Sequence, residues 1–194
     1  MARGRDKSVS RKMKPVFLVF CEGETEENYV DFIRRQYKSP IKIVPKTEGN
    51  AISQRLICKR QNELKLSKEE KISTFLMYDL DVAPMVEKLK SCHAVWLCSN
   101  PCVELWFLLH SHAQTAELTT EQCLHTLQKA NEIWQNYQKP LLTDAQKNFL
   151  WENKTVAVER AKNLLGSANP SSSVYKLIEA IESYKSNATT TFWT

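Results

Sequence analysis

The first 115 residues alternate between short unbroken apolar runs and stretches in which apolar residues recur at helical spacing. The short runs predict strands that are buried on both faces, and the spaced pattern predicts amphipathic helices. The predicted strands cover residues 16–21, 41–44, 72–79 and 94–98. The predicted helices cover residues 25–38, 52–64 and 84–90. This alternation predicts an α/β fold with a mostly parallel sheet flanked by helices.

The second half of the chain shows only the helical pattern. Thr119 and Gln122 have the spacing of a capping box, and apolar residues recur at helical spacing from there into the segment after Ser173. We therefore expect three parts along the chain. They are a basic N-terminal arm at residues 1–14, an α/β core at 15–115, and a C-terminal helical layer at 116–194 that packs on the core.

The charge is concentrated at the N-terminus. The chain has 194 residues and a formal net charge of +5, and residues 1–14 hold six basic side chains against the single acidic Asp6. The arm therefore carries the whole excess, and the rest of the chain is neutral. A basic arm is typical of proteins that bind polyphosphates, but a solubilising terminus explains it equally well.

Cysteine content and hydropathy indicate the compartment. The six cysteines are not dense enough for a disulfide scaffold, and no secretory leader is evident. We therefore expect a reducing cytoplasm. No apolar run approaches the length of a bilayer span, so we expect no membrane contact. Cys98 and Cys102 with His110 and His112 do not match the spacing of a usual zinc finger, which disfavours a structural zinc site.

The first strand ends at acidic residues. The apolar run 16–21 is followed by Glu22 and Gly23, and a helix is expected to begin at Thr25. Glu22 and Glu26 would then lie on either side of a tight turn at a helix N-terminus, where their oxygens could converge on a hard cation such as Mg²⁺. The alternative is that these glutamates only favour the helix dipole.

A second predicted strand ends in the same way, at Asp79 and Asp81. Two carboxylates this close repel each other unless a cation or a proton compensates, which favours a metal-binding pair. The alternative is an ordinary turn, since aspartates often end strands.

Glu104 is the exception in an otherwise apolar helix predicted at residues 102–110. Ser99 or Asn100 is expected to cap this helix, with Pro101 in its first turn. A carboxylate in a buried helix is costly unless it is paired, caps the helix or coordinates a metal, so Glu104 is a third candidate ligand. The alternative is that it caps the helix or reaches solvent.

Several catalytic classes lack their motifs. The sequence contains neither a P-loop nor a dinucleotide-binding glycine pattern, and its four glycines cannot build the usual nucleotide-binding loop. No nucleophilic triad is evident. An ATPase activity, if one is required, must come from another chain.

Several of these motifs resemble one family. Cys21–Glu26, the Asp79-x-Asp81 pair, Ser99–His110 with its Ser-Asn-Pro-Cys start, and Asn169–Leu177 closely resemble the RloB-like (AbiLii-like) family of prokaryotic defence proteins. The resemblance implies a catalytic core similar to the Toprim domain. By position, Glu22 matches the Toprim glutamate and Glu26 an auxiliary carboxylate, and both are expected to be catalytic together with Asp79 and Asp81. The Mg²⁺ or Mn²⁺ ligands that the resemblance implies are Glu22, Asp79 and Asp81. Glu104, the candidate ligand from the buried helix, lies in the family motif but has no universal Toprim counterpart.

The resemblance also implies a function. We expect a metal-dependent endonuclease that cleaves DNA or RNA, with tRNA among the candidate substrates, acting in anti-phage defence or abortive infection beside an SMC/ABC-type ATPase. The alternative is a non-catalytic regulatory subunit that binds nucleic acid or the ATPase and holds a structural metal. The basic residues expected to contact nucleic acid are Lys14, Arg34, Arg35, Lys46 and Lys154. The sequence leaves open the substrate, the trigger, homo-oligomerisation, and any role for His110, His112, Phe192 and Trp193.

Overall fold

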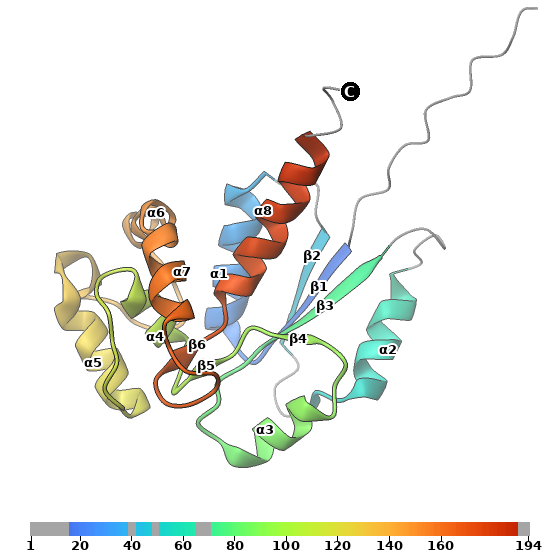
Figure 1. Ribbon diagram of the computed structural model, residues 1–194, viewed down its shortest axis with the longest axis horizontal. Helices are drawn as coiled ribbons and strands as arrows, with labels where there is room; N and C mark the ends of the chain where they lie inside the picture. The colour runs from blue at the N-terminus through green and yellow to red at the C-terminus, as the bar shows by residue number, and fades with distance from the viewer. Residues whose placement is uncertain (1–15, 39–41, 48–50, 65–70, 190–194) are drawn as a thin grey trace, which may run out of the picture.

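A parallel sheet of four strands forms the centre of the fold. The computed structural model describes residues 16–38, 42–47, 51–64 and 71–189 (Figure 1). The strand order is β2-β1-β3-β4, and every neighbouring pair is parallel. The strands are β1 (Val16–Cys21), β2 (Lys42–Thr47), β3 (Ile72–Met77) and β4 (Val95–Trp96). The predicted α/β class and parallel sheet are confirmed, and the layout agrees with a Toprim-like arrangement.

The central strand β1 is buried on both faces, as its apolar run predicts. Phe17, Val19 and Cys21 belong to one core cluster, whereas Leu18 and Phe20 belong to the other. Successive strand residues point to opposite faces, so both faces of the sheet are covered. Helix α1 covers one face, and α2 and α3 cover the other (Figure 1). These helices are α1 (Glu24–Gln36), α2 (Gln54–Glu63) and α3 (Ala83–Lys90).

The later helices pack in the same core cluster as α1. Helix α4 has no exposed residue, and its Trp106 Nε1 donates a hydrogen bond of 2.8 Å to the Tyr29 hydroxyl on α1. Trp134 stacks on Phe107 with ring centroids 5.9 Å apart, which joins the C-terminal helices to α4. These elements are α4 (Val103–Leu109), α5 (Thr120–Ala130), the 3-10 helix η2 (Glu132–Trp134), α6 (Asp144–Glu152), α7 (Lys154–Lys162) and α8 (Tyr175–Thr189).

A second, two-stranded sheet joins two of the sequence motifs. Strand β5 (Ser99–Asn100) pairs antiparallel with β6 (Ser171–Ser172), and the Ser99 and Ser172 hydroxyls lie 3.0 Å apart. The prediction that Ser99 or Asn100 caps the next helix is therefore wrong. Both residues are held in the β5–β6 pair, and Cys102 is the cap of α4.

Two predicted strand boundaries also differ. Strand β2 continues through Pro45 to Thr47, because it lies at the edge of the sheet, where a missing backbone N–H is tolerated. Strand β3 ends at Met77, and Asp79 beyond it forms an isolated bridge with Ser99.

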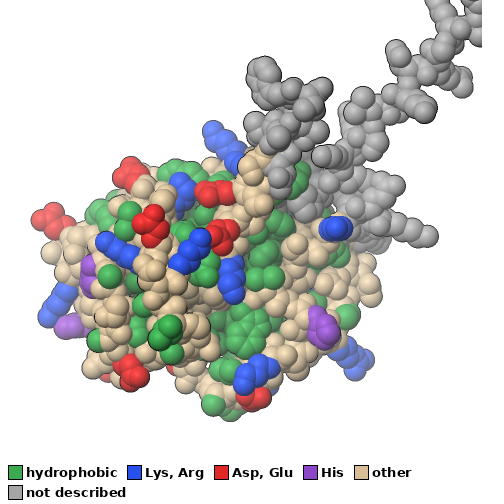
Figure 2. All heavy atoms as spheres, viewed as in Figure 1, with side chains coloured by type: hydrophobic (Ala, Val, Ile, Leu, Met, Phe, Trp, Pro, Cys, Tyr) green, Lys and Arg blue, Asp and Glu red, His purple; other side chains and the backbone are tan. Residues whose placement is uncertain are grey.

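The visible surface is mixed in charge. Figure 2 shows basic and acidic side chains interspersed over the face that carries α7 and α8. The predicted basic arm at residues 1–14, together with Phe192 and Trp193, lies outside the described residues. None of the described helices combines the length and the apolar composition that a bilayer span requires.

Candidate functional site

Glu22 connects the ends of the two central strands. It directly follows β1, and its backbone N–H donates a hydrogen bond of 3.0 Å to the Met77 carbonyl at the end of β3. Its side-chain Oε2 accepts the backbone N–H of Asp79 at 2.8 Å. Burial raises the pKa of Glu22, and the nearby Asp81 raises it further. The prediction that the acidic residues after β1 and β3 lie close together is therefore confirmed for Glu22 and Asp79.

Glu26 lies in the first turn of α1, and its side chain reaches back to Gly23 at the same edge of the sheet. Its Oε2 accepts the Gly23 backbone N–H at 3.1 Å, and a Cβ atom added to Gly23 would lie only 3.2 Å from this oxygen. Glycine therefore allows the close approach of the carboxylate. Burial raises the pKa of Glu26 to about 7, and the negative charges of Glu104 and Glu22 contribute to the shift.

Asp79 is the most strongly perturbed carboxylate of the group. Burial raises its pKa well above the usual value, and Glu26 is the next largest cause. Its Oδ1 atom is buried and has no hydrogen-bond partner among the described residues. Such an oxygen is costly unless a proton or a cation satisfies it.

Asp81 lies at the exposed side of the group. The Thr120 hydroxyl, at the start of α5, is 3.4 Å from Oδ2 of Asp81. Asp81 also lines an open cleft of about 530 Å³ together with Asn100 and Gln122. Asp81 is therefore the carboxylate of this group that lies beside open solvent.

Glu104 has no exposed surface, and one of its oxygens accepts a hydrogen bond while the other lies in an ion pair without a hydrogen bond. Its Oε1 accepts the Tyr137 hydroxyl at 2.9 Å, and its Oε2 lies 2.8 Å from Nζ of Lys139. Burial lowers the pKa of Lys139, but the neighbouring carboxylates, Glu104 first, outweigh this and raise it overall. Tyr137 and Lys139 were not predicted from the sequence, because both lie more than 30 residues from Glu104 in an irregular segment.

The five carboxylates have the chemistry of a Mg²⁺ site but not its final geometry. All five are oxygen donors, and burial together with neighbouring carboxylates raises the pKa of Glu22, Glu26 and Asp79. The buried Oδ1 of Asp79 has no hydrogen-bond partner among the described residues, which fits a hard cation. In the described part of the chain, however, no group of three or more His, Cys, Asp and Glu side chains is arranged to hold a metal. The ligands and catalytic residues expected from the sequence stay predictions.

The residues expected to contact nucleic acid have other partners or lie outside the description. Arg34 and Arg35 both pair with Asp31 on α1, as expected for ordinary helix-surface pairs. Nζ of Lys154 lies 4.2 Å from the centre of the Trp151 ring. Lys14 and the side chain of Lys46 lie outside the described residues.

His110 has a structural environment. It is buried, and its Nδ1 lies 2.8 Å from the Trp106 carbonyl one turn earlier. Burial lowers its pKa to about 3, so the ring is neutral at physiological pH. Nothing in this arrangement assigns it to the acidic site.

Comparison with known proteins identifies the family. A family profile described as "RloB-like protein" matches residues 17–181. The chain belongs to the RloB-like family. The matched region runs from β1 into α8 and so contains all five carboxylates and Lys139 of this RloB-like chain. No curated protein and no solved structure matches it.

Proposed function

We propose that this chain is a metal-dependent endonuclease that hydrolyses phosphodiester bonds in DNA or RNA. The observation that supports this most is the contact of Glu22 with Asp79 at the carboxyl ends of two adjacent parallel strands. This edge is where α/β proteins form their sites, and the carboxylates gathered there are those the family resemblance implies. Glu22, Asp79 and Asp81 would hold Mg²⁺ or Mn²⁺, with Glu104 joining them if it exchanges Lys139 for the metal.

Each residue of the site then has a chemical role. A bound divalent ion would supply positive charge for the scissile phosphate and lower the pKa of an attacking water. Glu26, with a pKa of about 7, is suited to accept and return a proton near neutral pH. Lys139 supplies an ammonium group at the same edge, where it neutralises Glu104 in the free protein and can face a phosphate when substrate binds.

The biological setting is part of the same proposal. The resemblance to prokaryotic defence proteins supports a role in anti-phage defence or abortive infection, with tRNA among the candidate substrates. The sequence has no nucleotide-binding loop, so the proposed system includes a separate SMC/ABC-type ATPase as partner.

One observation favours the second candidate, a non-catalytic regulatory subunit. Lys139 already neutralises Glu104, and two backbone N–H groups satisfy Glu22 and Glu26. Three carboxylates of the acidic edge thus have partners within the protein, whereas Oδ1 of Asp79 has none among the described residues. Such internal pairing suits a structural or partner-binding role.

Turnover separates the two functions. The full chain is incubated with single- and double-stranded DNA and RNA, including tRNA, in Mg²⁺ or Mn²⁺, with and without an SMC/ABC-type ATPase from a neighbouring gene. We expect cleavage that Glu22→Gln and Asp79→Asn abolish. The exposed Glu24, in the first turn of α1, provides the matched control, since Glu24→Gln should cleave as wild type. A wild-type protein that cuts none of these substrates, while its variants still bind the ATPase, would overturn the nuclease.

A further inference from the structure

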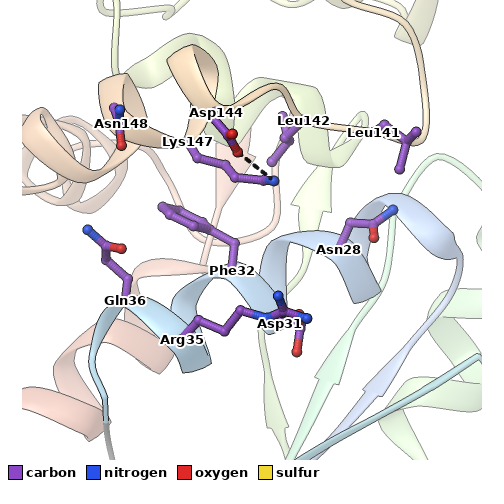
Figure 3. Close-up of a pocket in the computed structure, with 10 residues that line it drawn as sticks. All are labelled: Asn28, Asp31, Phe32, Arg35, Gln36, Leu141, Leu142, Asp144, Lys147 and Asn148. Atoms are coloured by element: carbon purple, nitrogen blue, oxygen red, sulfur yellow. Dashed lines mark hydrogen bonds and ion pairs between the residues drawn. The ribbon is translucent and has the colours of Figure 1, made fainter.

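Two hollows at the surface of the described structure differ in charge. In the groove between α1 and α6, shown in Figure 3, two carboxylates, Asp31 and Asp144, lie beside two cations, Arg35 and Lys147, so the charges balance. A pocket of about 590 Å³ beside strand β4 instead has Lys176 as the only charged side chain among its lining residues. The pocket beside β4 therefore favours an anion, whereas the groove between α1 and α6 favours neither sign of charge.

One side of this β4 pocket is apolar and aromatic. Leu80, Val95 and Trp96 line it, with Val95 41% exposed and Trp96 partly exposed. Figure 2 shows hydrophobic side chains on the visible face between α3 and α8, the region in which β4 lies in Figure 1. A partly exposed indole offers a ring against which a nucleobase can stack.

The opposite side of the β4 pocket carries a cation without a counter-ion. Lys176 is exposed and forms no ion pair with any described residue. It is the second residue of α8, so it lies at the positive end of the helix dipole. The ammonium group and the helix N-terminus together attract an anion.

A buried hydroxyl adds a second, independent indication of a ligand. Ser171 also lines the β4 pocket and is only 2% exposed, yet its hydroxyl has no hydrogen-bond partner in the described part of the chain. Ser173, two residues later, directs its hydroxyl to the Trp96 carbonyl at 2.9 Å, and residues two apart in an extended chain point the same way. Buried polar groups normally have a partner, so the Ser171 hydroxyl is suited to bond a ligand in the pocket.

The β4 pocket adjoins the acidic site. Leu80, which lines the pocket, directly follows Asp79. Burial raises the pKa of the Cys98 thiol, another lining group, to about 12, the charge of Asp79 raises it further, and that of Lys176 lowers it. Asp79 and Lys176 are therefore both close enough to act on the same thiol.

We propose that the β4 pocket binds one nucleotide, with its phosphate at Lys176 and Ser171 and its base against Trp96. The ammonium group and the hydroxyl are donors for phosphate oxygens, and no lining carboxylate opposes them. The volume lies within the roughly 300–1,000 Å³ range of pockets that enclose small molecules. The nucleotide is either free or one unit of a nucleic-acid strand, and its binding does not require cleavage.

Calorimetry on the full chain without divalent metal tests this site, with ribonucleoside 5′-monophosphates and inorganic phosphate as probes. Lys176→Gln should weaken nucleotide binding about tenfold, and Ser171→Ala about threefold or more. Ser171→Ala breaks no hydrogen bond of the described structure, so this variant should fold as wild type. Trp96→Leu should weaken nucleotide binding about fivefold or more, with thermal unfolding as the check on its fold.

Lys129→Gln on α5 is the matched control. Lys129 is likewise exposed and forms no ion pair with a described residue, so its replacement should leave nucleotide binding unchanged. A labelled single-stranded oligonucleotide distinguishes the two sources of the nucleotide. If Lys176→Gln weakens oligonucleotide binding, the pocket holds one unit of a strand. If it weakens only mononucleotide binding, the ligand is a free nucleotide.

Three results would overturn the site. The first is a wild-type protein that binds none of these probes, and the second is equal binding by wild type, Lys176→Gln and Ser171→Ala. The third is inorganic phosphate that binds as tightly as the nucleotides while Trp96→Leu has no effect, because the pocket then takes an anion only.

Nucleotide binding and cleavage can fail independently. If Glu22→Gln abolishes cleavage while Lys176→Gln binds every probe as wild type does, the nuclease stands and the β4 pocket fails. Nucleotide binding that depends on Lys176, in a wild-type protein that never cleaves, gives the reverse result.

Discussion

Nζ of Lys139 lies 2.8 Å from Oε2 of Glu104, a carboxylate with no exposed surface. A buried ionised carboxylate is costly unless a positive charge is paired with it, and here the pairing group comes from the segment between η2 and α6. The C-terminal helices thus do more than extend the core, because the segment joining them supplies a positive charge at the acidic edge of the sheet.

Removing the Lys139 ammonium group should make the stability of the folded protein depend more strongly on Mg²⁺. Lys139→Met leaves Glu104 unpaired, and we expect the free energy of unfolding to fall by about 1–3 kcal/mol, since Lys139 itself is partly exposed. Added Mg²⁺ should recover more stability in this variant than in wild type, because a cation now replaces the lost charge. Thermal unfolding with and without Mg²⁺ measures both effects.

The control is Lys162→Met, which breaks a half-exposed pair with Glu179 between α7 and α8. It should change stability little and show no added response to Mg²⁺. An identical metal response in the two variants would contradict the placement of the cation site at Glu104.

The Tyr137 hydroxyl should also stabilise the folded protein, because it is a partner of the buried Glu104. It donates to Oε1 of Glu104 at 2.9 Å in a buried setting, so Tyr137→Phe leaves this oxygen without its donor. We expect a loss of about 1–3 kcal/mol in urea unfolding. Tyr175→Phe, at a partly exposed ring on α8, should be close to neutral, and equal losses in both variants would refute the role of the hydrogen bond.

Glu26 should make the metal-free protein less stable as the pH rises. Its pKa is about 7 in the folded protein and about 4.3 when unfolded, so the folded state holds the proton more tightly between these values. The contribution of Glu26 to the free energy of unfolding therefore decreases from about pH 4.3 to pH 7. Glu26→Gln keeps an acceptor for the Gly23 N–H without the charge.

This variant should exceed wild type in stability by on the order of 2–3 kcal/mol above pH 7, and the difference should vanish below about pH 4. Denaturant unfolding over this pH range checks the prediction. Glu24→Gln, in the same turn but exposed, should show no such dependence. His110 also responds to pH, with the opposite sign, but its contribution is shared by both proteins and cancels.

Ser173 should stabilise the junction of the two sheets. Its hydroxyl donates to the Trp96 carbonyl at 2.9 Å and accepts the Cys98 backbone N–H at 2.9 Å. Ser173→Ala removes both hydrogen bonds, and we expect a loss of about 1–3 kcal/mol. Ser91→Ala removes an exposed hydroxyl contact at the end of α3 and should cost less. Mg²⁺ affinity, followed by calorimetry, should be unchanged in both variants.

Local patterns were sufficient to locate the strands of the parallel sheet, the helices that cover it and the acidic strand ends. The run Val16–Cys21 predicted a strand buried on both faces, because only a central parallel strand is apolar at every position. Glu22 and Asp79 follow two such strands, and the carboxyl ends of parallel strands meet at one edge, so their proximity followed from order along the chain.

The tertiary structure decided which partner each polar group has. Ser99 and Asn100 have the composition of a helix cap, but they pair with Ser171 and Ser172, which lie about 70 residues later in the chain. Glu104 is neutralised by Lys139, and nothing in either local sequence specifies that contact. Hydrogen bonds and ion pairs depend on distance in space, and a sequence pattern reports only distance along the chain.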